Sequence, residues 1–227
     1  MIHARKLLRN EETAVDKKLT AILIKATDVR ESDKTVRLFS VEEGRVTATM
    51  RGVRKNAAKL KYAAQPFALC CYEISEKNGK KIVTGASPIE DLYPLCLDPE
   101  KYAAGCVMLE VTDNANSSVE NAKLFVVLLK ALKTLLYGKA SSTVVVTKFI
   151  QKVLSMSGFV KAPERVDAEP ETPAKALGFI AYKSLDELET AEIKPGVIKR
   201  ALKSVAADFC REYETELTSL AVYEKML

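Results

Sequence analysis

The sequence predicts an α+β protein in which a small five-stranded β-barrel is followed by an all-α helical domain. The first half of the chain contains short β-rich stretches, and apolar residues recur at helical spacing in the second half. With 227 residues, 48% of them hydrophobic, the chain is long enough to bury a core in each part. We therefore expect an N-terminal extension at residues 1–18, a barrel domain at residues 19–90 and a helical domain at residues 98–227.

Five stretches of the first half are expected to be strands. They lie at residues 19–28, 35–41, 45–53, 67–74 and 81–87. Asn78-Gly79 separates the last two stretches and is typical of a type I′ hairpin. Five short strands of this kind fit the OB-fold, which closes into a small barrel. A five-stranded sandwich or an SH3-like barrel would give the same pattern.

The expected fourth strand is preceded by Gln65-Pro66-Phe67. Proline lacks an N–H group and suits the first residue of a strand, so we expect Phe67 to point into the barrel. Tyr62, just before this segment, is expected to pack at the approach to the strand, and stacking on a base is the alternative.

The helical half begins where Asp98 can cap a helix whose first residue is Pro99. A second helix is expected from Ser118 to Gly138, a third over residues 143–157, and a long last helix over residues 195–213. Residues 161–175 hold three prolines and four acidic residues, which indicates a surface loop.

Positive charge is concentrated at the start of the chain. Residues 1–62 contain fifteen basic and eight acidic side chains, a net charge of +7, whereas the whole chain has a net charge of +5. The segment RGVRKNAAKLK, residues 51–61, contains no acid, and the strand before it alternates arginine and threonine with apolar residues. OB barrels bind nucleic acid on one strand face and its flanking loops. The candidate DNA-binding residues are Arg30, Lys34, Arg37, Arg45, Arg51, Arg54, Lys55, Lys59 and Lys61.

The residue types needed for common catalytic and metal sites are scarce. The one histidine, His3, lies near the start of the chain, and the nine glycines form none of the usual phosphate-binding loops. The five cysteines form no CxxC motif and are expected to be reduced thiols. We therefore expect no enzyme activity, no metal and no cofactor. No apolar run approaches the ~20 residues of a membrane span, which favours a soluble intracellular protein.

Three stretches resemble, in order and spacing, the bacterial recombination mediator family RecO. They are RESDKTVRLFSVEEGRV at residues 30–46, RGVRKNAAKLKYAAQPF at residues 51–67 and YAAGCVMLEVTD at residues 102–113. The later segment LLKALKTLLYG is similar to the next helix of that family. The resemblance covers about residues 19–160 of the 227.

This resemblance implies an N-terminal OB-fold followed by a helical domain. It also implies binding to single- and double-stranded DNA, annealing of complementary strands, and help with loading RecA through RecR. Family members dock on the acidic C-terminal tail of single-stranded DNA-binding protein, and they act in the bacterial cytoplasm at the nucleoid.

The chain departs from the family at three places, one of which is an unusual lead of about eighteen residues before the first expected strand. Many members carry four zinc-binding cysteines after the third helix, whereas GFVKAPERVDAEPETPAK has none, so a zinc module is not expected. The glycine usual before Glu31-Ser32-Asp33 is Arg30, which adds a cation to that turn.

A stripe on the second helix is the candidate dock for the acidic tail, because leucines on the opposite side would fill the core. It consists of Lys123, Val126, Val127, Lys130 and Lys133. A plain solvated helix face would have the same composition. For the whole chain, the alternatives to a DNA-annealing mediator are a protein–protein adaptor and an OB-fold protein that binds RNA.

Overall fold

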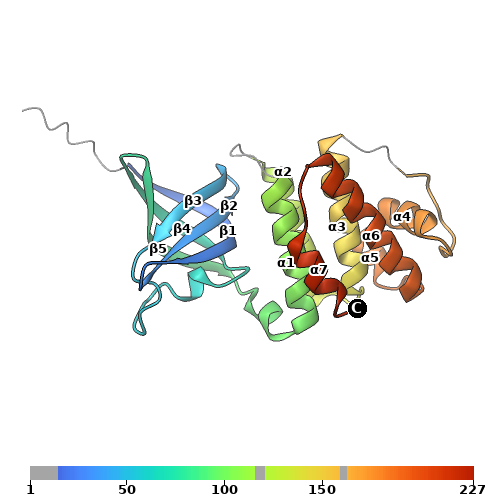
Figure 1. Cartoon of the computed structure of the whole chain (residues 1–227), viewed down its shortest axis with the longest axis horizontal. Helices are drawn as coiled ribbons and strands as arrows, with labels where there is room; N and C mark the ends of the chain where they lie inside the picture. The colour runs from blue at the N-terminus through green and yellow to red at the C-terminus, as the bar shows by residue number, and fades with distance from the viewer. Residues whose placement is uncertain (1–14, 116–120, 159–162) are drawn as a thin grey trace, which may run out of the picture.

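The computed structural model describes residues 15–115, 121–158 and 163–227, and it places a closed β-barrel beside a bundle of helices (Figure 1). The strands are β1 (Val15–Val29), β2 (Asp33–Ser40), β3 (Gly44–Met50), β4 (Leu69–Lys77) and β5 (Lys80–Glu90). They follow one another around the barrel in the order β1-β2-β3-β5-β4, and β4 returns to β1. This is the OB-fold topology that the strand pattern predicted.

The strands follow the expected order, and four of them are longer than expected, whereas β3 is shorter and ends at Met50 instead of Val53. β1 begins at Val15, four residues before the expected start, because its first residues pair with the end of β4. Residues 1–14 of the predicted extension lie outside the described part of the chain. The hairpin between β4 and β5 turns at Asn78 and Gly79, whose φ angles of 53° and 69° are those of a type I′ turn.

The helical half contains more helices than the sequence predicted. They are α1 (Pro99–Ala115), α2 (Ala122–Tyr137), α3 (Ser142–Ser157), α4 (Pro173–Tyr182), α5 (Leu185–Leu188), α6 (Pro195–Glu212) and α7 (Thr218–Glu224), with the short 3₁₀ turns η1 (Tyr62–Ala64) and η2 (Tyr93–Leu97) before them. α4, α5 and α7 were not predicted, and α4 takes the last three residues of the expected loop.

The predicted ends of the main helices agree with the caps seen in the structure. The Asp98 carboxylate accepts hydrogen bonds from the N–H groups of Glu100 and Lys101 at 3.0 and 3.1 Å. Asn121 caps α2 in the same way, whereas the predicted start at Ser118 lies outside the described residues. Gly158, with φ of 73°, ends α3 in the left-handed conformation that favours glycine.

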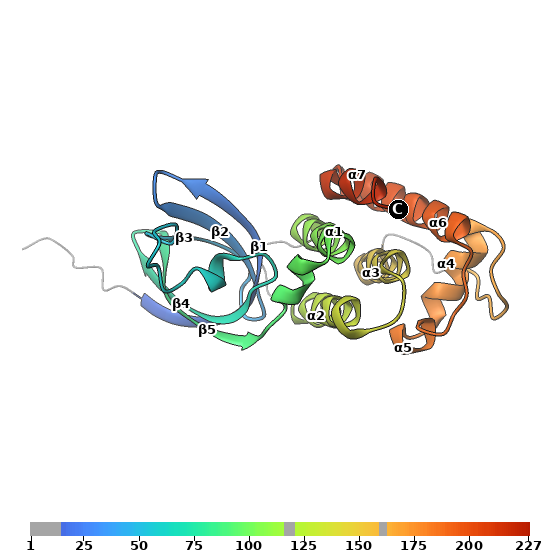
Figure 2. The same cartoon turned by 90° about the horizontal axis from the view of Figure 1, so that it is seen from below.

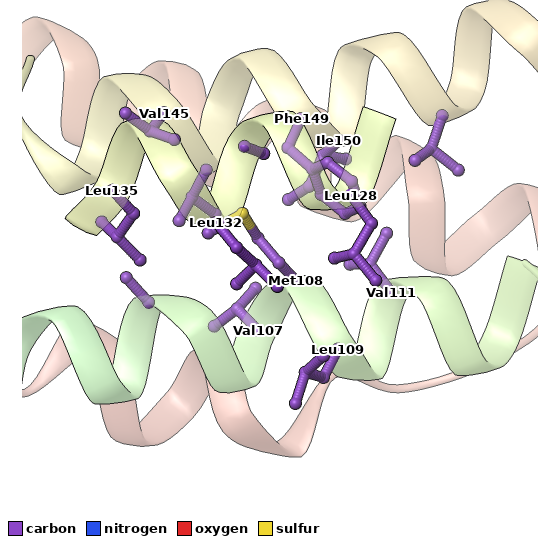
Figure 3. Packing of buried hydrophobic residues seen from close by; sticks show 14 of the residues in the cluster. Val107, Met108, Leu109, Val111, Leu128, Leu132, Leu135, Val145, Phe149 and Ile150 are labelled. Atoms are coloured by element: carbon purple, nitrogen blue, oxygen red, sulfur yellow. The ribbon is translucent and has the colours of Figure 1, made fainter. Parts of the chain in front are cut away.

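The layers of the molecule can be followed in Figure 2. α1 and α2 lie next to the barrel, α3 lies behind them, α7 lies beside α1, and α4 and α6 lie on the far side. Buried side chains of α1, α2 and α3 meet in one apolar core, for example Met108 of α1, Leu132 of α2 and Phe149 of α3 (Figure 3). The core continues into the outer side of the barrel through Ile22, Phe39 and other residues of β1 and β2, which makes the two halves one packed unit.

The join between the two halves depends on a glycine of α1. A Cβ atom at Gly105 would lie 2.7 Å from two ring atoms of Phe67, so the ring lies directly on the helix backbone. The ring also meets Tyr102 edge-on, with 5.9 Å between centroids. The expectation that Phe67 fills the barrel is wrong: its φ is 65°, it precedes β4, and its ring belongs to the core shared with the helices.

Two hydrogen-bonding groups of α1 hold other parts of the chain. The Glu110 carboxylate accepts hydrogen bonds from the backbone and hydroxyl groups of Thr218 and Ser219 at the start of α7. Asp113 pairs with arginines of the barrel. α1 therefore contacts the barrel on one side and positions the C-terminal helix on the other.

We predict that Gly105→Ala will destabilise the protein. The gain in helix propensity is about 1 kcal/mol, but displacing the Phe67 ring from a packed core costs about 1–3 kcal/mol. Urea unfolding followed by circular dichroism measures the net change. Gly196→Ala is the matched control, because a Cβ there meets nothing within 4 Å. Equal free energies of unfolding for the two variants would contradict the close contact.

Candidate nucleic-acid interface

The outer face of β1, β2 and β3 carries polar side chains in register. Lys25 of β1 lies opposite Arg37 of β2, which lies opposite Thr47 of β3. One step further along, Thr27, Thr35 and Thr49 form a second row across the same strands. The residues between them, such as Val36 and Ala48, are buried inside the barrel. The face is therefore a strip of cations and hydroxyl groups on a rigid sheet.

The basic segment after β3 is fixed to the start of β2. The Asp33 carboxylate accepts a hydrogen bond from the N–H of Gly52 at 2.8 Å, and the N–H of Arg54 donates to the carbonyl of Ser32 at 3.0 Å. Gly52 has φ of 64°, a conformation that a side chain would strain. These bonds hold the first turn of the basic segment beside the turn that contains Arg30.

The pKa of Asp33 is lowered, first of all by the hydrogen bond from Gly52. The hydroxyl of Ser32 and the charges of Arg30 and Arg51 act in the same direction. The carboxylate is therefore ionised at neutral pH, and its link to the basic segment weakens only when the pH falls below the ordinary range of an aspartate.

The predicted cations divide into free and paired groups. Among the described residues, five are exposed and have no ion pair: Arg30, Arg51, Lys55, Lys59 and Lys61. Lys34 and Arg54 both pair with Asp28, at 3.6 and 3.3 Å. Arg54 also donates to the carbonyl of Arg30 at 3.2 Å. The bonds of Gly52 and Arg54 to the start of β2 place Arg30 and Arg51, two of the free cations, near the end of the strip formed by Thr27, Thr35 and Thr49.

Arg37 and Arg45 have a different environment at the other end of the strip. Both pair with Asp113 near the end of α1, and Arg45 also donates to the Asp113 carbonyl at 3.3 Å. These two arginines join the barrel to the helices, a role that the sequence did not predict for them.

Sequence reasoning missed three members of the strip and one further basic site. The three missed members are Lys25, Thr27 and Thr35. The β1 sequence shows no clean alternation of polar and apolar residues, because the strand has an irregularity between Leu23 and Lys25. The exposed hairpin lysines Lys77 and Lys80 flank the predicted turn on the same barrel. Their position beside Asn78-Gly79 was the signal that could have identified them.

Tyr62 lies beside the basic segment and is 42% exposed. Its hydroxyl group donates to the carbonyl of Ala86 in β5, which fixes the ring against the barrel. The expected packing role is thus present, and one face of the residue remains open to solvent.

The predicted stripe on α2 does not form a single surface. Val127 lines a groove of about 550 Å³ between α2, α3 and α4, Val126 and Lys133 line a second hollow beside α5, and Lys130 lies between the two and lines both. Lys133 pairs with Glu90 of β5 at 3.0 Å. Lys123 is exposed and lines neither hollow.

The groove between α2, α3 and α4 combines apolar and basic side chains. Its apolar lining includes Val127, Ala131, Val145, Phe149, Leu154 and Leu177. Its basic lining is Lys130, Lys148, Lys152 and Lys183, against one acid, Asp208. The Lys148 ammonium donates to the carbonyls of Ile180 and Ala181 at 2.8 Å each. Burial lowers the pKa of Lys148 to about 8, and the neighbouring charge of Lys152 acts in the same direction.

Two classes of feature are missing from the described part of the chain. It contains no cluster of three or more histidine, cysteine, aspartate or glutamate side chains that could hold a metal ion. None of the helices in residues 15–115, 121–158 and 163–227 is long and apolar enough to cross a membrane.

Comparison with known proteins identifies one matching family and several similar proteins. The family described as "Recombination protein O N terminal" matches residues 15–91. DNA repair protein RecO of Nocardioides sp. is 26% identical over 147 residues, which cover 63% of this chain and 60% of that protein. DNA repair protein RecO of Desulforamulus reducens is 29% identical over 144 residues, covering 62% and 55%.

A shorter and more similar match is DNA repair protein RecO of Anaeromyxobacter sp. (strain K), at 36% identity over 66 residues, or 29% of this chain and 26% of that protein. The longer matches span 55 to 60% of the length of those relatives. The resemblance to RecO that the sequence motifs indicated is confirmed, and the barrel is the domain that the family describes.

We predict that Asp33→Ala will free the basic segment without unfolding the barrel. Gly52 loses the acceptor of its N–H, so its amide should exchange hydrogen faster. Hydrogen exchange measured by NMR tests this, with the Thr49 amide inside β3 as the internal reference. Asp167→Ala, on the far loop, is the control, because Asp167 pairs only with Arg165 in the described structure. Unchanged exchange at Gly52 would show that the Asp33 bond does not hold the turn.

Proposed function

We propose that this chain is a DNA-binding recombination mediator that acts in DNA repair. The barrel binds single- and double-stranded DNA without sequence preference and brings complementary strands together. With RecR, the protein assists the loading of RecA onto DNA that is coated by single-stranded DNA-binding protein. It works in the bacterial cytoplasm at the nucleoid.

One observation carries this proposal. Five cations that are exposed and unpaired within the described part of the chain lie in the turn before β2 and in the segment after β3, on an OB barrel that matches the RecO N-terminal family. OB barrels bind nucleic acid on this kind of strand face with its flanking loops. Strands β2 and β3 hold the strip rigid, and Asp33 holds the basic segment against it. The cations are thereby presented on a preformed surface.

The chemistry of the surface favours binding to the backbone of DNA. Lysine and arginine displace the counterions condensed on phosphates, which gives affinity that is independent of sequence and sensitive to salt. The threonine hydroxyls of the second row can donate to phosphate oxygens. Annealing then requires only that charge is neutralised while two strands are held together. It needs no nucleotide, metal or catalytic residue, so we propose that the protein is not an enzyme.

We predict that reversing three charges of the basic segment will abolish DNA binding. The variant is Arg51→Glu with Arg54→Glu and Lys55→Glu, measured by fluorescence anisotropy with a labelled oligothymidylate at several salt concentrations. If about six cations contact phosphates, the unmodified protein should give a log–log salt slope of about −4 on single strands.

The matched control reverses Lys139, Arg165 and Lys175, which are exposed on the helical half and give the same change in net charge. This control should bind nearly as well as the unmodified chain. Unchanged affinity in the first variant would disprove the barrel surface as the DNA site. Equal competition by RNA would favour a general nucleic-acid binder.

We propose that the groove between α2, α3 and α4 takes the acidic C-terminal tail of single-stranded DNA-binding protein. Four lysines and one acid at its edge complement a peptide rich in carboxylates, and its apolar lining can accept an apolar last residue. The proposed docking site differs from the predicted stripe on α2. It retains Val127 and Lys130 of the stripe and adds Lys148, Lys152 and Lys183.

The low pKa of Lys148 makes docking depend on pH. With a pKa of about 8, its ammonium group is mostly charged at pH 7 and mostly neutral at pH 9. The neighbouring Lys130 and Lys152 lower this pKa and Glu187 raises it. Peptide carboxylates are ionised throughout this range. The attraction therefore decreases as the pH rises from 7 to 9.

We predict that an aspartate-rich peptide ending in phenylalanine will bind more weakly at pH 9 than at pH 7 in isothermal titration calorimetry. Lys148→Met should remove most of this pH dependence. Lys130→Glu with Lys152→Glu should weaken binding at both pH values and leave the affinity for naked DNA nearly unchanged. The control is Lys123→Glu with Lys139→Glu, outside the groove. Equal peptide binding by the two double variants would place the dock elsewhere.

A further inference from the structure

We propose that Arg37 and Arg45 form a second phosphate-binding subsite of the DNA surface, which the Asp113 carboxylate occupies until DNA displaces it. This inference rests on the proposed DNA binding by the barrel. In this inference, a carboxylate of the helical half competes with DNA phosphates for two arginines of the barrel.

The two oxygens of the Asp113 carboxylate have different surroundings. Asp113 Oδ2 bonds to Arg37, but Oδ1 lies 3.8 Å from Arg45 Nη1, is buried, and has no hydrogen-bond partner among the residues that the structure describes. Arg45 instead donates to the Asp113 backbone carbonyl at 3.3 Å. A carboxylate held by two parallel hydrogen bonds is the stronger arrangement. One of the two carboxylate oxygens is therefore incompletely satisfied, which makes the contact replaceable.

The helix dipole of α1 also disfavours a negative charge on the Asp113 side chain. The residue lies in the last turn of the helix, which ends at Ala115. Helix carbonyls make this end partially negative, so a carboxylate there gains nothing from the helix. Within the described part of the chain, Arg37 and Arg45 are the ion-pair partners of this carboxylate. A phosphate carries the same sign of charge and more acceptor oxygens, and it can take both guanidinium groups.

The subsite continues the polar strip. Lys25 lies opposite Arg37 across the β1–β2 pair, and Thr47 lies opposite Arg37 on the β3 side. The side chains of Arg37 and Arg45 are 37% and 36% exposed, whereas that of Asp113 is 14% exposed. A strand that follows the strip from Arg51 therefore reaches these arginines from the solvent side, opposite the carboxylate.

Release of Asp113 would not separate the two halves of the molecule. The Phe39 ring of β2 packs on Phe125 of α2, with 5.6 Å between centroids, and Phe67 packs on Gly105. These apolar contacts remain when the carboxylate moves away. Asp113 can therefore act as a competitor for the arginines without being required for the fold.

The test compares Asp113→Asn with Glu224→Gln. Both variants lose one negative charge, but Glu224 lies on α7 and pairs with Lys203, far along the chain from the barrel. Affinity for a labelled oligothymidylate is measured by anisotropy across a salt series. Asp113→Asn should bind several-fold more tightly than the control, with a log–log slope steeper by up to about 1.4 if two further phosphates are engaged.

Adding Arg37→Gln and Arg45→Gln to Asp113→Asn should remove the gain. Arg37→Gln and Arg45→Gln should lower the DNA affinity less in a chain that keeps Asp113. In that chain, breaking the ion pairs with Asp113 offsets the free energy of the arginine–phosphate contacts. Equal affinity and slope for Asp113→Asn and Glu224→Gln would overturn the inference, as would a gain that persists without the arginines.

The result is distinguishable from failure of the proposed function. If the unmodified chain does not bind the oligonucleotide at all, the DNA-binding proposal itself fails. If it binds and Asp113→Asn behaves as the control does, only the subsite is refuted. Thermal unfolding checks the fold of each variant, and Asp113→Ser, with a smaller side chain, replaces the asparagine variant if that variant is unfolded.

Discussion

The ring of Phe67 lies against the backbone of α1 at Gly105, and the relative position of the two halves depends on this contact. Because any side chain at Gly105 would overlap the ring, the helix approaches the barrel more closely than an ordinary pair of packed elements. That approach brings Asp113 to the barrel arginines and leaves Glu110 on the other side to cap α7. One helix thereby positions the barrel, the bundle and the C-terminal segment.

The excess positive charge of the chain is divided between two uses on one barrel. At the end of the strip near the basic segment, cations such as Arg51 and Lys55 face solvent without ion pairs among the described residues. At the end near α1, Arg37 and Arg45 are held by Asp113. The Asp113 side chain is 14% exposed, so these pairs are partly buried between the two halves of the molecule. Their position on a surface proposed to bind phosphates is the more informative property.

The segment before α4, described from residue 163 onward, packs on the backbone of that helix. A Cβ atom at Gly178 of α4 would lie 2.1 Å from the carbonyl oxygen of Glu164, so the loop crosses directly over the helix. The hydroxyl of Tyr182 donates to the carbonyl of Pro163 at 3.0 Å. These contacts fix the described part of the loop, and the same α4 supplies one wall of the lysine-lined groove.

The sequence by itself determined those features that depend on neighbours in the chain. The Asn78-Gly79 hairpin, the Asp98 cap, the Gly158 stop and the alternation along β3 follow from local backbone conformation and side-chain periodicity. Only the tertiary structure decided which cations are free, because Asp113 lies 76 residues from Arg37 and no local pattern links them. It likewise decided that Phe67 packs on α1, that Lys25 joins the strip, and that several helices enclose the groove. Such contacts arise from packing between distant segments, which residue spacing along the chain does not encode.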